Sequence, residues 1–315
     1  MLRLELVRHL HLARSPSRGR AAHLAAASGL VRAGRHVYVV ADDEHHLGVF
    51  DAGTRRPGTL HRIRVGTLPD GTKARKRAKP DFEAIVALPA FSGCPFGALF
   101  VLGSGSRPNR RSGVLLPLAA DGRLRGSPRR IELGPWFALL TREFGQPNVE
   151  GAFVDGPYLS LLQRGNKSSA NDARVRMRLA PTLDALARGR APGAATFGSV
   201  TRYRLPEVNG VPLCLTDGAA LPGGGFAFTA VAEDTRDAVA DGECAGSAIG
   251  LVGADDRVRA LWRLDPPLKV EGIAVTSHTA SLELMVCTDA DDPDHPGRLL
   301  RVVLGPAALR AVYRG

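Results

Sequence analysis

Short apolar runs separated by turn residues recur along the whole chain. Between residues 81 and 133 there are four of them, at 81–89, 97–102, 113–118 and 129–133. Runs of this length, rich in β-branched residues and bounded by Gly, Pro or Asp, are typical of consecutive antiparallel strands. Four such strands in succession make one blade of a β-propeller.

The same order of runs recurs elsewhere in the chain. One copy comprises 29–32, 36–41, 47–50 and 60–65, and another comprises 219–221, 226–232, 247–252 and 258–264. The last copy has only three runs, at 270–276, 282–287 and 298–304. The alternating segment 2–10 is expected to supply its outer strand, because an N-terminal strand paired there closes the ring and removes an exposed edge.

The middle copy is irregular. Its second run (158–162) and the next clear one (199–205) are separated by a polar stretch that contains a helical pattern at 182–188. We interpret residues 166–197 as an insertion over one face. The sequence therefore predicts an all-β fold, a five-bladed β-propeller of four-stranded antiparallel blades, in a single domain over residues 1–315. Six blades, or two domains, are the alternatives, but the repeat is uninterrupted and no long Pro/Gly/Ser linker divides it.

Each copy begins with a similar short segment, in which an oxygen-bearing residue precedes a Gly or Ala. These residues are Ser28, Glu83, Glu150, Asp217 and Glu271, at intervals of roughly 55 to 70 residues. The first strand of a propeller blade lines the central channel, so the five side chains are expected to form a ring. At an effective dielectric constant of 20, two carboxylates ~7 Å apart repel each other by roughly 2.4 kcal/mol.

That repulsion can be relieved by a bound cation, by shared protons or by arginines that reach into the ring. Ligands that are all oxygen select a hard ion, and calcium (Ca²⁺) tolerates a wide ring better than Mg²⁺. The ring thus predicts a Ca²⁺ site. The alternative is that the carboxylates accept backbone N–H hydrogen bonds and tie neighbouring blades together.

The loops that follow the second strands are expected on the same face as this ring, and they are polar. Asp42 and Asp43 are candidates to position or deprotonate a water, and Arg107 and Arg164 are candidates to hold an anionic substrate. The basic segment 73–79 is either a phosphate-binding loop or a solvated one. His9 and His11 share one strand face and could bind zinc, but no further ligand cluster is evident in the sequence.

Composition narrows the list of partners. The net charge of +11 would attract polyanions, but aromatic residues make up only 5% of the chain, too few for a base-stacking platform. We expect a small anionic substrate or ligand, no specific nucleic acid and no membrane; a protein partner is compatible with the polar face. The N-terminus lacks the pattern of a secretory signal, and the four cysteines are scattered, which together predict a cytoplasmic location and reduced thiols.

The order Ser-Glu-Glu-(Ser/Asp)-Glu, one residue per blade, resembles the soluble calcium-activated nucleotidases (apyrases). Segment 28–49 is similar to their first blade, Gln163-Arg164 falls where they have an arginine-bearing loop, and 269–273 is similar to their last-blade motif. The motif around Glu271 also resembles bacterial phytase-like propellers of uncharacterised function, which the chain resembles more closely. The resemblance implies a five-bladed propeller with calcium in its channel. Asp217, the single arginine after Gln163 and the lack of pocket tryptophans depart from the nucleotidase pattern.

Two main functions remain open from the sequence, and lactonase or esterase chemistry on the same metal is a third. The first is a calcium-dependent hydrolase of phosphoesters or nucleotides on the polar face of the channel. The second is a non-catalytic propeller that binds a ligand or a protein and whose ion is purely structural.

Overall fold

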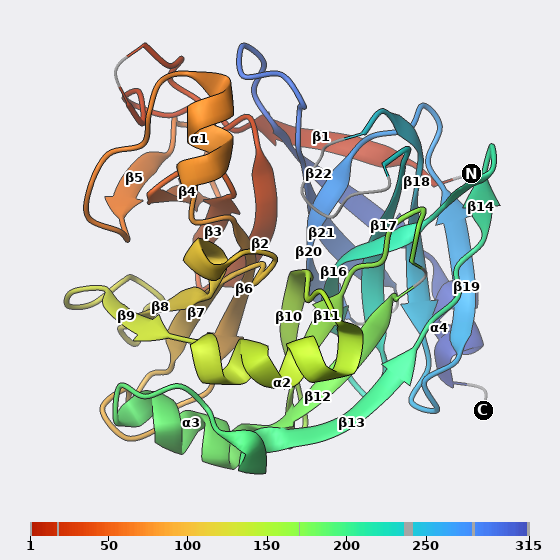
Figure 1. Cartoon of the computed structure of the whole chain (residues 1–315). Coiled ribbons are helices and arrows are strands. Elements are labelled where there is room, and N and C mark those ends of the chain that lie inside the picture. Colours follow the sequence, from red (N-terminus) through yellow and green to blue (C-terminus); the bar gives the residue numbers. More distant parts are fainter. Residues whose placement is uncertain (1, 18, 170, 236–241, 279–280, 314–315) are drawn as a thin grey trace.

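The computed structural model of the chain describes residues 2–17, 19–169, 171–235, 242–278 and 281–313. Within them, five four-stranded antiparallel sheets surround a central channel (Figure 1). Blade 1 is β2 (Ala27–Ala33), β3 (His36–Ala41), β4 (His46–Asp51) and β5 (Thr59–Arg62). Blade 2 is β6 (Phe82–Leu88), β7 (Ala98–Gly103), β8 (Ser112–Pro117) and β9 (Arg129–Glu132).

The other blades follow the same order. Blade 3 is β10 (Val149–Asp155), β11 (Tyr158–Gln163), β12 (Ala173–Arg178) and β13 (Phe197–Arg202). Blade 4 is β16 (Cys214–Ala220), β17 (Phe226–Glu233), β18 (Cys244–Val252) and β19 (Val258–Arg263). Blade 5 is β20 (Val270–His278), β21 (Leu282–Thr288), β22 (Arg298–Leu304) and β1 (Leu4–His9). A small hairpin, β14 (Glu207–Val208) and β15 (Val211–Pro212), precedes blade 4.

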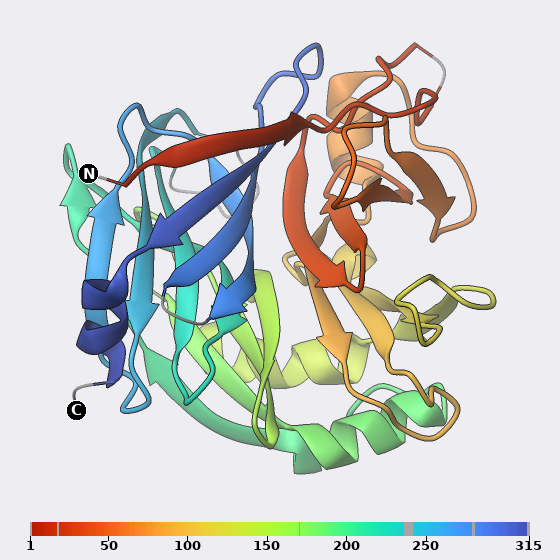
Figure 2. The same ribbon diagram turned by 180° about the vertical axis from the view of Figure 1, so that it is seen from behind.

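The predicted five-bladed propeller is confirmed, and so is its closure. β1 pairs antiparallel with β22, with Leu4 opposite Val302 and His9 opposite Arg298. Figure 2 shows β1 running along β22 and then passing toward blade 1. The strand that starts the chain therefore completes the blade that ends it, as its alternating pattern predicts.

The interpretation of residues 166–197 as an insertion is wrong, because this range contains one of the four strands of blade 3. Residues 173–178 form β12, the third strand of blade 3, and helix α3 (Leu179–Ala187) connects it to β13. The strand was missed because its sequence alternates three arginines with apolar residues, and one of them, Arg174, is buried. Third-to-fourth-strand connections lie on the face opposite the second-to-third-strand loops, so α3 lies away from the channel end that carries the polar loops.

Three further helices were not predicted from the sequence. α1 (Thr72–Ala78) lies in the link between blades 1 and 2, α2 (Gly134–Phe144) in the link between blades 2 and 3, and α4 (Pro306–Tyr313) follows β22. α2 buries Trp136 and Phe137, and Trp136 stacks on Phe100 of β7. α4 packs against β19, β21 and β22.

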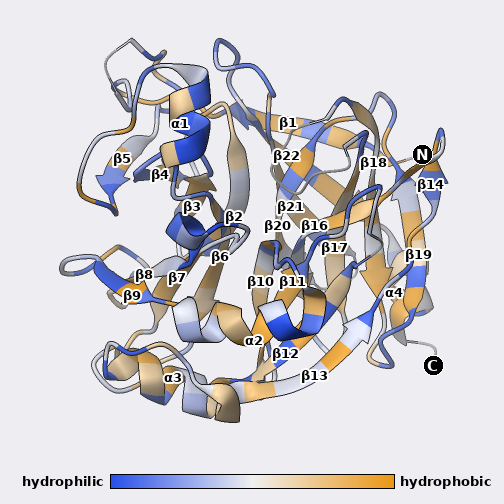
Figure 3. Cartoon of the chain, viewed as in Figure 1, coloured by the Kyte–Doolittle hydropathy of each residue, from blue (hydrophilic) through white to orange (hydrophobic). Residues whose placement is uncertain are grey.

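The core lies between the blades. Apolar strand residues face one another there, and polar residues gather on outer strands and loops (Figure 3). All four cysteines are free thiols, and only Cys244 is not buried. Within the described residues, no helix is long and apolar enough to cross a lipid bilayer.

Candidate functional site in the central cavity

A β-bulge interrupts the inner strand of every blade at the polar residue of the repeat. In β2, Ala27 lies opposite Ala41 and Gly29 opposite Val40, so Ser28 is the extra residue. The pairing shifts in the same way at Glu83, Glu150 and Glu271, and at Thr216–Asp217 in β16. Bulges turn a side chain out of the regular alternation. The repeated motif is therefore the sequence signature of a bulge that aims one residue along the channel.

The small residue after each polar position follows from the close approach of neighbouring inner strands. A Cβ on Gly151 would lie 2.6 Å from an oxygen of Asp217, and one on Gly272 would lie 2.7 Å from the backbone nitrogen of Leu30. Both separations are far inside van der Waals contact. A glycine is thus required at these two positions, where the bulged strands of adjacent blades meet around the axis.

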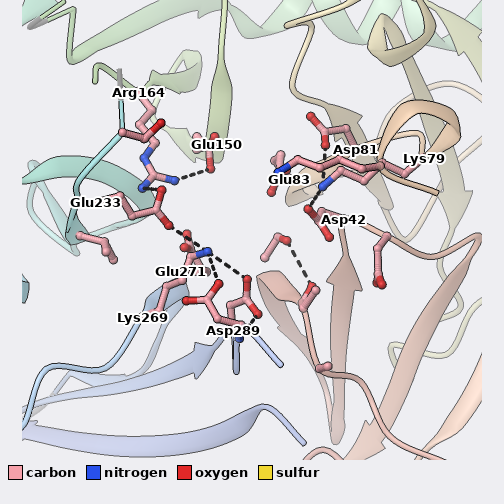
Figure 4. Close-up of a pocket in the computed structure, with 18 of the residues that line it drawn as sticks. Asp42, Lys79, Asp81, Glu83, Glu150, Arg164, Glu233, Lys269, Glu271 and Asp289 are labelled. Carbon is pink, nitrogen blue, oxygen red and sulfur yellow. Dashed lines mark hydrogen bonds and ion pairs between the residues drawn. The ribbon is translucent and has the colours of Figure 1, made fainter. Parts of the chain in front are cut away.

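A cavity of about 240 Å³ opens among these residues. Eleven carboxylates and seven basic side chains line it, an excess of four negative charges. The acids are Asp42, Asp43, Asp70, Asp81, Glu83, Glu150, Glu233, Glu271, Asp289, Asp291 and Asp292, and the bases are Arg20, Arg75, Lys76, Lys79, Arg110, Arg164 and Lys269. Ser28 also lines the cavity. Figure 4 shows that the labelled charges form two groups on opposite sides of it.

The first group joins blades 1 and 2 through Lys79. The buried ammonium is hydrogen bonded to Asp42 and lies 3.0 Å from Asp81 Oδ1. Arg110, only 1% exposed, lies 2.7 Å from the other oxygen of Asp81. Asp42, Asp81 and Glu83 each place a carboxylate oxygen within 4.8 Å of the others, as in a cation site. In this structure the positive charges beside them are those of Lys79 and Arg110.

The second group joins blades 3, 4 and 5. Arg164 lies 3.4 Å from Glu150 and 3.0 Å from Glu233. Lys269 continues the chain of charges, 2.8 Å from Glu233 and 3.2 Å from Asp289. A buried lysine therefore bridges two adjacent blades on each side of the channel.

Glu83 and Glu271 stand apart from these pairs. Within the described part of the chain, no hydrogen bond or ion pair reaches either side-chain carboxylate, although both line the cavity and Glu271 is only 5% exposed. Burial, reinforced by the charge of Glu150, holds the pKa of Glu83 well above its usual range. Burial also raises the pKa of Glu271, against the charges of Arg164 and Lys269. These carboxylates lack a counter-charge of their own.

Two predicted site residues lie elsewhere. Asp217 does not line the cavity: its side-chain oxygens accept the backbone N–H groups of Gly218 (2.8 Å) and Ile273 (3.0 Å). Its predicted place in the ligand ring is corrected, because it makes the inter-blade tie that was the alternative interpretation. Arg107 is likewise outside the cavity lining, and Arg110 of the same loop points into the cavity in its place.

The remaining predicted residues do come together. Ser28, Glu83, Glu150 and Glu271 line the cavity, as do Asp42, Asp43 and Arg164. Asp43 pairs with Arg20 at 2.7 Å.

The interpretation of segment 73–79 as a solvated loop is wrong, because most of it is helix α1, whose Arg75 is buried and lies 2.7 Å from Glu44.

Sequence reasoning missed Lys79 and Lys269 as cavity residues. Their rarity was the available signal, since the chain has only five lysines and these two directly precede inner strands.

The metal-free chain is expected to lose stability as the pH rises from about 4 to about 7. Burial raises the pKa of Asp42 from 3.8 to about 7, against the charge of Lys79, and burial raises that of Asp172 to about 6. The folded state thus holds protons that the unfolded state has released, so its extra stability is complete below about pH 4 and lost as the pH passes these folded-state values. One pKa unit corresponds to about 1.4 kcal/mol, so the decrease should reach a few kcal/mol.

Urea unfolding in EDTA at pH 4.5, 6 and 7.5 measures this decrease. The Asp42→Asn variant should have a smaller decrease over the whole range and should lose most of it between pH 6 and 7.5, where Asp172 no longer contributes. An equal slope in both proteins would contradict the assignment to Asp42.

Comparison with solved structures finds matches of low identity that extend over most of the chain. A luciferin-regenerating enzyme is 12% identical, with a TM-score of 0.45 over 97% of each chain. The arabinanase Arb43A of Bacillus subtilis is 11% identical, with a TM-score of 0.44 over 90% of this chain and 96% of that one. The hydrazine synthase of Kuenenia stuttgartiensis is 11% identical, with a TM-score of 0.38, and the match spans 87% of this chain but only 59% of that chain. At such identities the likeness concerns the fold alone.

No curated protein matches the sequence. The sequence model of a family of unknown function (DUF6929) matches residues 23–304. Since that match covers most of the chain, the protein belongs to this family.

Proposed function

We propose that the chain binds a divalent cation, Ca²⁺, in its central cavity and hydrolyses a phosphoester or nucleotide there. The observation that carries the proposal is the excess of four carboxylates around the cavity, with Glu83 and Glu271 lacking any partner in the described residues. Buried carboxylates without a counter-charge are costly, and a cation among them removes that cost. The net charge of the whole chain is +11, but the cavity lining itself has more acidic than basic side chains.

The donors fit a hard ion. Glu83, Glu150 and Glu271 would hold it with carboxylate oxygens, and Ser28 offers a hydroxyl whose present hydrogen bond, to the carbonyl oxygen of Ala26, is 3.3 Å long. All are oxygen donors, which Ca²⁺ prefers in a flexible geometry that water can complete. Lys79 and Lys269 favour the charged form of the carboxylates beside them without entering this set.

Hydrolysis needs a base, positive charge for the phosphate and a water. When bound, the ion supplies positive charge that phosphate oxygens require and that makes a nearby water more acidic. Asp42 accepts the proton of the attacking water, because a carboxyl whose pKa is about 7 changes charge at neutral pH. As the new P–O bond forms, the ester P–O bond breaks, and the departing oxygen takes a proton from solvent water, to which Asp42 later returns the proton that it accepted. Arg164, between Glu150 and Glu233, contributes positive charge on the other side of the cavity.

The test is an activity screen with metal control. The chain is stripped with EDTA and assayed with nucleoside triphosphates and 4-nitrophenyl phosphate in Ca²⁺, in Mg²⁺ and without added metal. We expect hydrolysis that needs a divalent cation and is faster with Ca²⁺. Equal rates with and without metal would contradict the proposal.

A second function is favoured by the ion pairs themselves. Lys79, Arg110, Arg164 and Lys269 all already pair with protein carboxylates. Such a network suits a rigid, non-catalytic propeller in which an ion only joins blades. Calcium-dependent stability without turnover on any phosphoester would support this function over hydrolysis.

A further inference from the structure

Three histidines lie together where the propeller closes. His9 ends β1, and His11 follows two residues later. The backbone of His11 forms an antiparallel bridge with that of His23, just before blade 1. Alternate residues of an extended chain share a face, and directly paired residues on neighbouring chains also share one. The three imidazoles therefore project from the same side.

The separations between His11 and each of the other two rings are close to those in a metal site. The centroids of His9 and His11 are 5.8 Å apart, and those of His11 and His23 are 6.4 Å apart. With Zn–N bonds of about 2.0–2.1 Å, two imidazoles on one tetrahedral ion have centroids roughly 5.2 Å apart. Both pairs are edge-on rather than stacked. His9 and His11 are exposed, so small changes of their side-chain torsions can close the remaining gap.

His23 is held as a metal-binding histidine usually is. It is 7% exposed, and its Nε2 lies 3.0 Å from the backbone carbonyl oxygen of Pro293. A carbonyl only accepts, so Nε2 carries the hydrogen and Nδ1 keeps its lone pair. Histidine ligands commonly donate their other ring N–H to a backbone carbonyl in this way, which fixes the tautomer and the ring orientation.

The charges nearby are mixed. The pKa of Asp292 is lowered mainly by the backbone N–H of Asp294, with smaller contributions from His295 and His23, so a carboxylate charge lies near the rings. Arg298 lies opposite His9 in the pairing of β1 with β22, and its positive charge disfavours a cation there. Neutral imidazoles with a nearby carboxylate suit a borderline-soft ion and not the hard ion of the cavity.

We propose that His9, His11 and His23 form a transition-metal site that takes Zn²⁺, with water in the fourth position. The ion joins the closing strand of blade 5 to the segment that enters blade 1. It therefore fastens the propeller at its closure, in addition to the strand pairing, the Glu5–Arg301 ion pair and the hydrogen bonds of Arg8 to Thr54 and Arg56. This site is separate from the central cavity and does not depend on the function proposed for that cavity.

The experiment is a titration of the EDTA-stripped, dialysed protein with Zn²⁺ in millimolar Ca²⁺, followed by calorimetry and by thermal unfolding. We expect one high-affinity ion per chain and a rise in Tm. His9→Ala, His11→Ala and His23→Ala should each weaken binding at least as much as loss of a second-shell partner does, roughly 10- to 100-fold. Titration with Co²⁺ should give the intense visible absorption of a tetrahedral complex.

His36→Ala, in β3 and outside the trio, is the matched control and should bind Zn²⁺ like the wild type. Glu271→Gln should also leave Zn²⁺ binding unchanged, which separates this site from the cavity. If His23→Ala does not fold, the exposed His9 and His11 variants still decide the matter. Wild-type affinity in the trio variants, or no saturable binding in the wild type, would overturn the proposal.

Discussion

Replacement of Arg174 by alanine is expected to lower the free energy of unfolding by about 3–5 kcal/mol. Its side chain is only 1% exposed and joins two blades, with hydrogen bonds to Asp155 of blade 3 and to Asp256 of blade 4 (3.0 Å). The guanidinium also lies over the rings of Phe153 and Phe226, at 5.3 Å and 5.2 Å from their centroids. The substitution removes both cation–π contacts, leaves a void between the blades and takes the counter-charge from Asp155, whereas Asp256 keeps Arg176 at 2.7 Å.

Urea unfolding of the two proteins at one pH measures the difference. Arg188→Ala is the matched control, because its pair with Asp184 has side chains that are 62% and 72% exposed. An exposed pair of this kind contributes about 0.3–0.5 kcal/mol. A loss at Arg174 no larger than that at Arg188 would contradict the role of the buried arginine as a tie between blades.

Replacement of Asp42 by asparagine is expected to slow phosphoester hydrolysis by roughly 10²- to 10⁴-fold. The side chains have the same shape, so the substitution removes the proton-accepting oxygen and little else. Lys79 retains its second partner, Asp81 at 3.0 Å, which should keep the loop in place. The ion bound by Glu83, Glu150 and Glu271 should remain, so that Ca²⁺ affinity changes much less than turnover.

The measurement is kcat and KM in saturating Ca²⁺, with Asp121→Asn as the control. Asp121 lies in a turn between β8 and β9 and pairs with the exposed Arg123. A loss of turnover shared by the two variants would point to a general effect. An unchanged kcat in Asp42→Asn would remove Asp42 from the mechanism.

The fold could be predicted from the sequence because one local feature repeats. A polar residue followed by glycine or alanine is what a bulge beside a crowded axis requires, and the chain has it at Ser28, Glu83, Glu150 and Glu271. The repeated sequence pattern thus reflects the limited space around the channel axis. The third strand of blade 3 was not predicted because Arg174 in β12 has the polarity of a surface residue. Its burial depends on partners that are distant in the sequence.

The site was predicted only in part, for a related reason. The acidic ring can be predicted because its members occupy the same position in each repeat. The basic residues that pair with the cavity carboxylates do not occupy a repeated position. Lys79 comes from the link after α1 and Arg110 from the loop after β7, and nothing local in the sequence indicates that both reach Asp81. Asp217 shows the opposite error: it has the motif, but the bulge of β16 directs its oxygens to backbone N–H groups.

The most direct test of the central claim is a calorimetric titration of the EDTA-stripped chain with Ca²⁺. We predict one ion per chain in the wild type and a large loss of affinity in Glu271→Gln, which removes an unpartnered cavity carboxylate without changing its shape. Glu132→Gln, whose side chain is 70% exposed on the outer strand β9, should bind like the wild type. Absence of binding at millimolar Ca²⁺, or equal affinity in all three proteins, would contradict a cation in the central cavity.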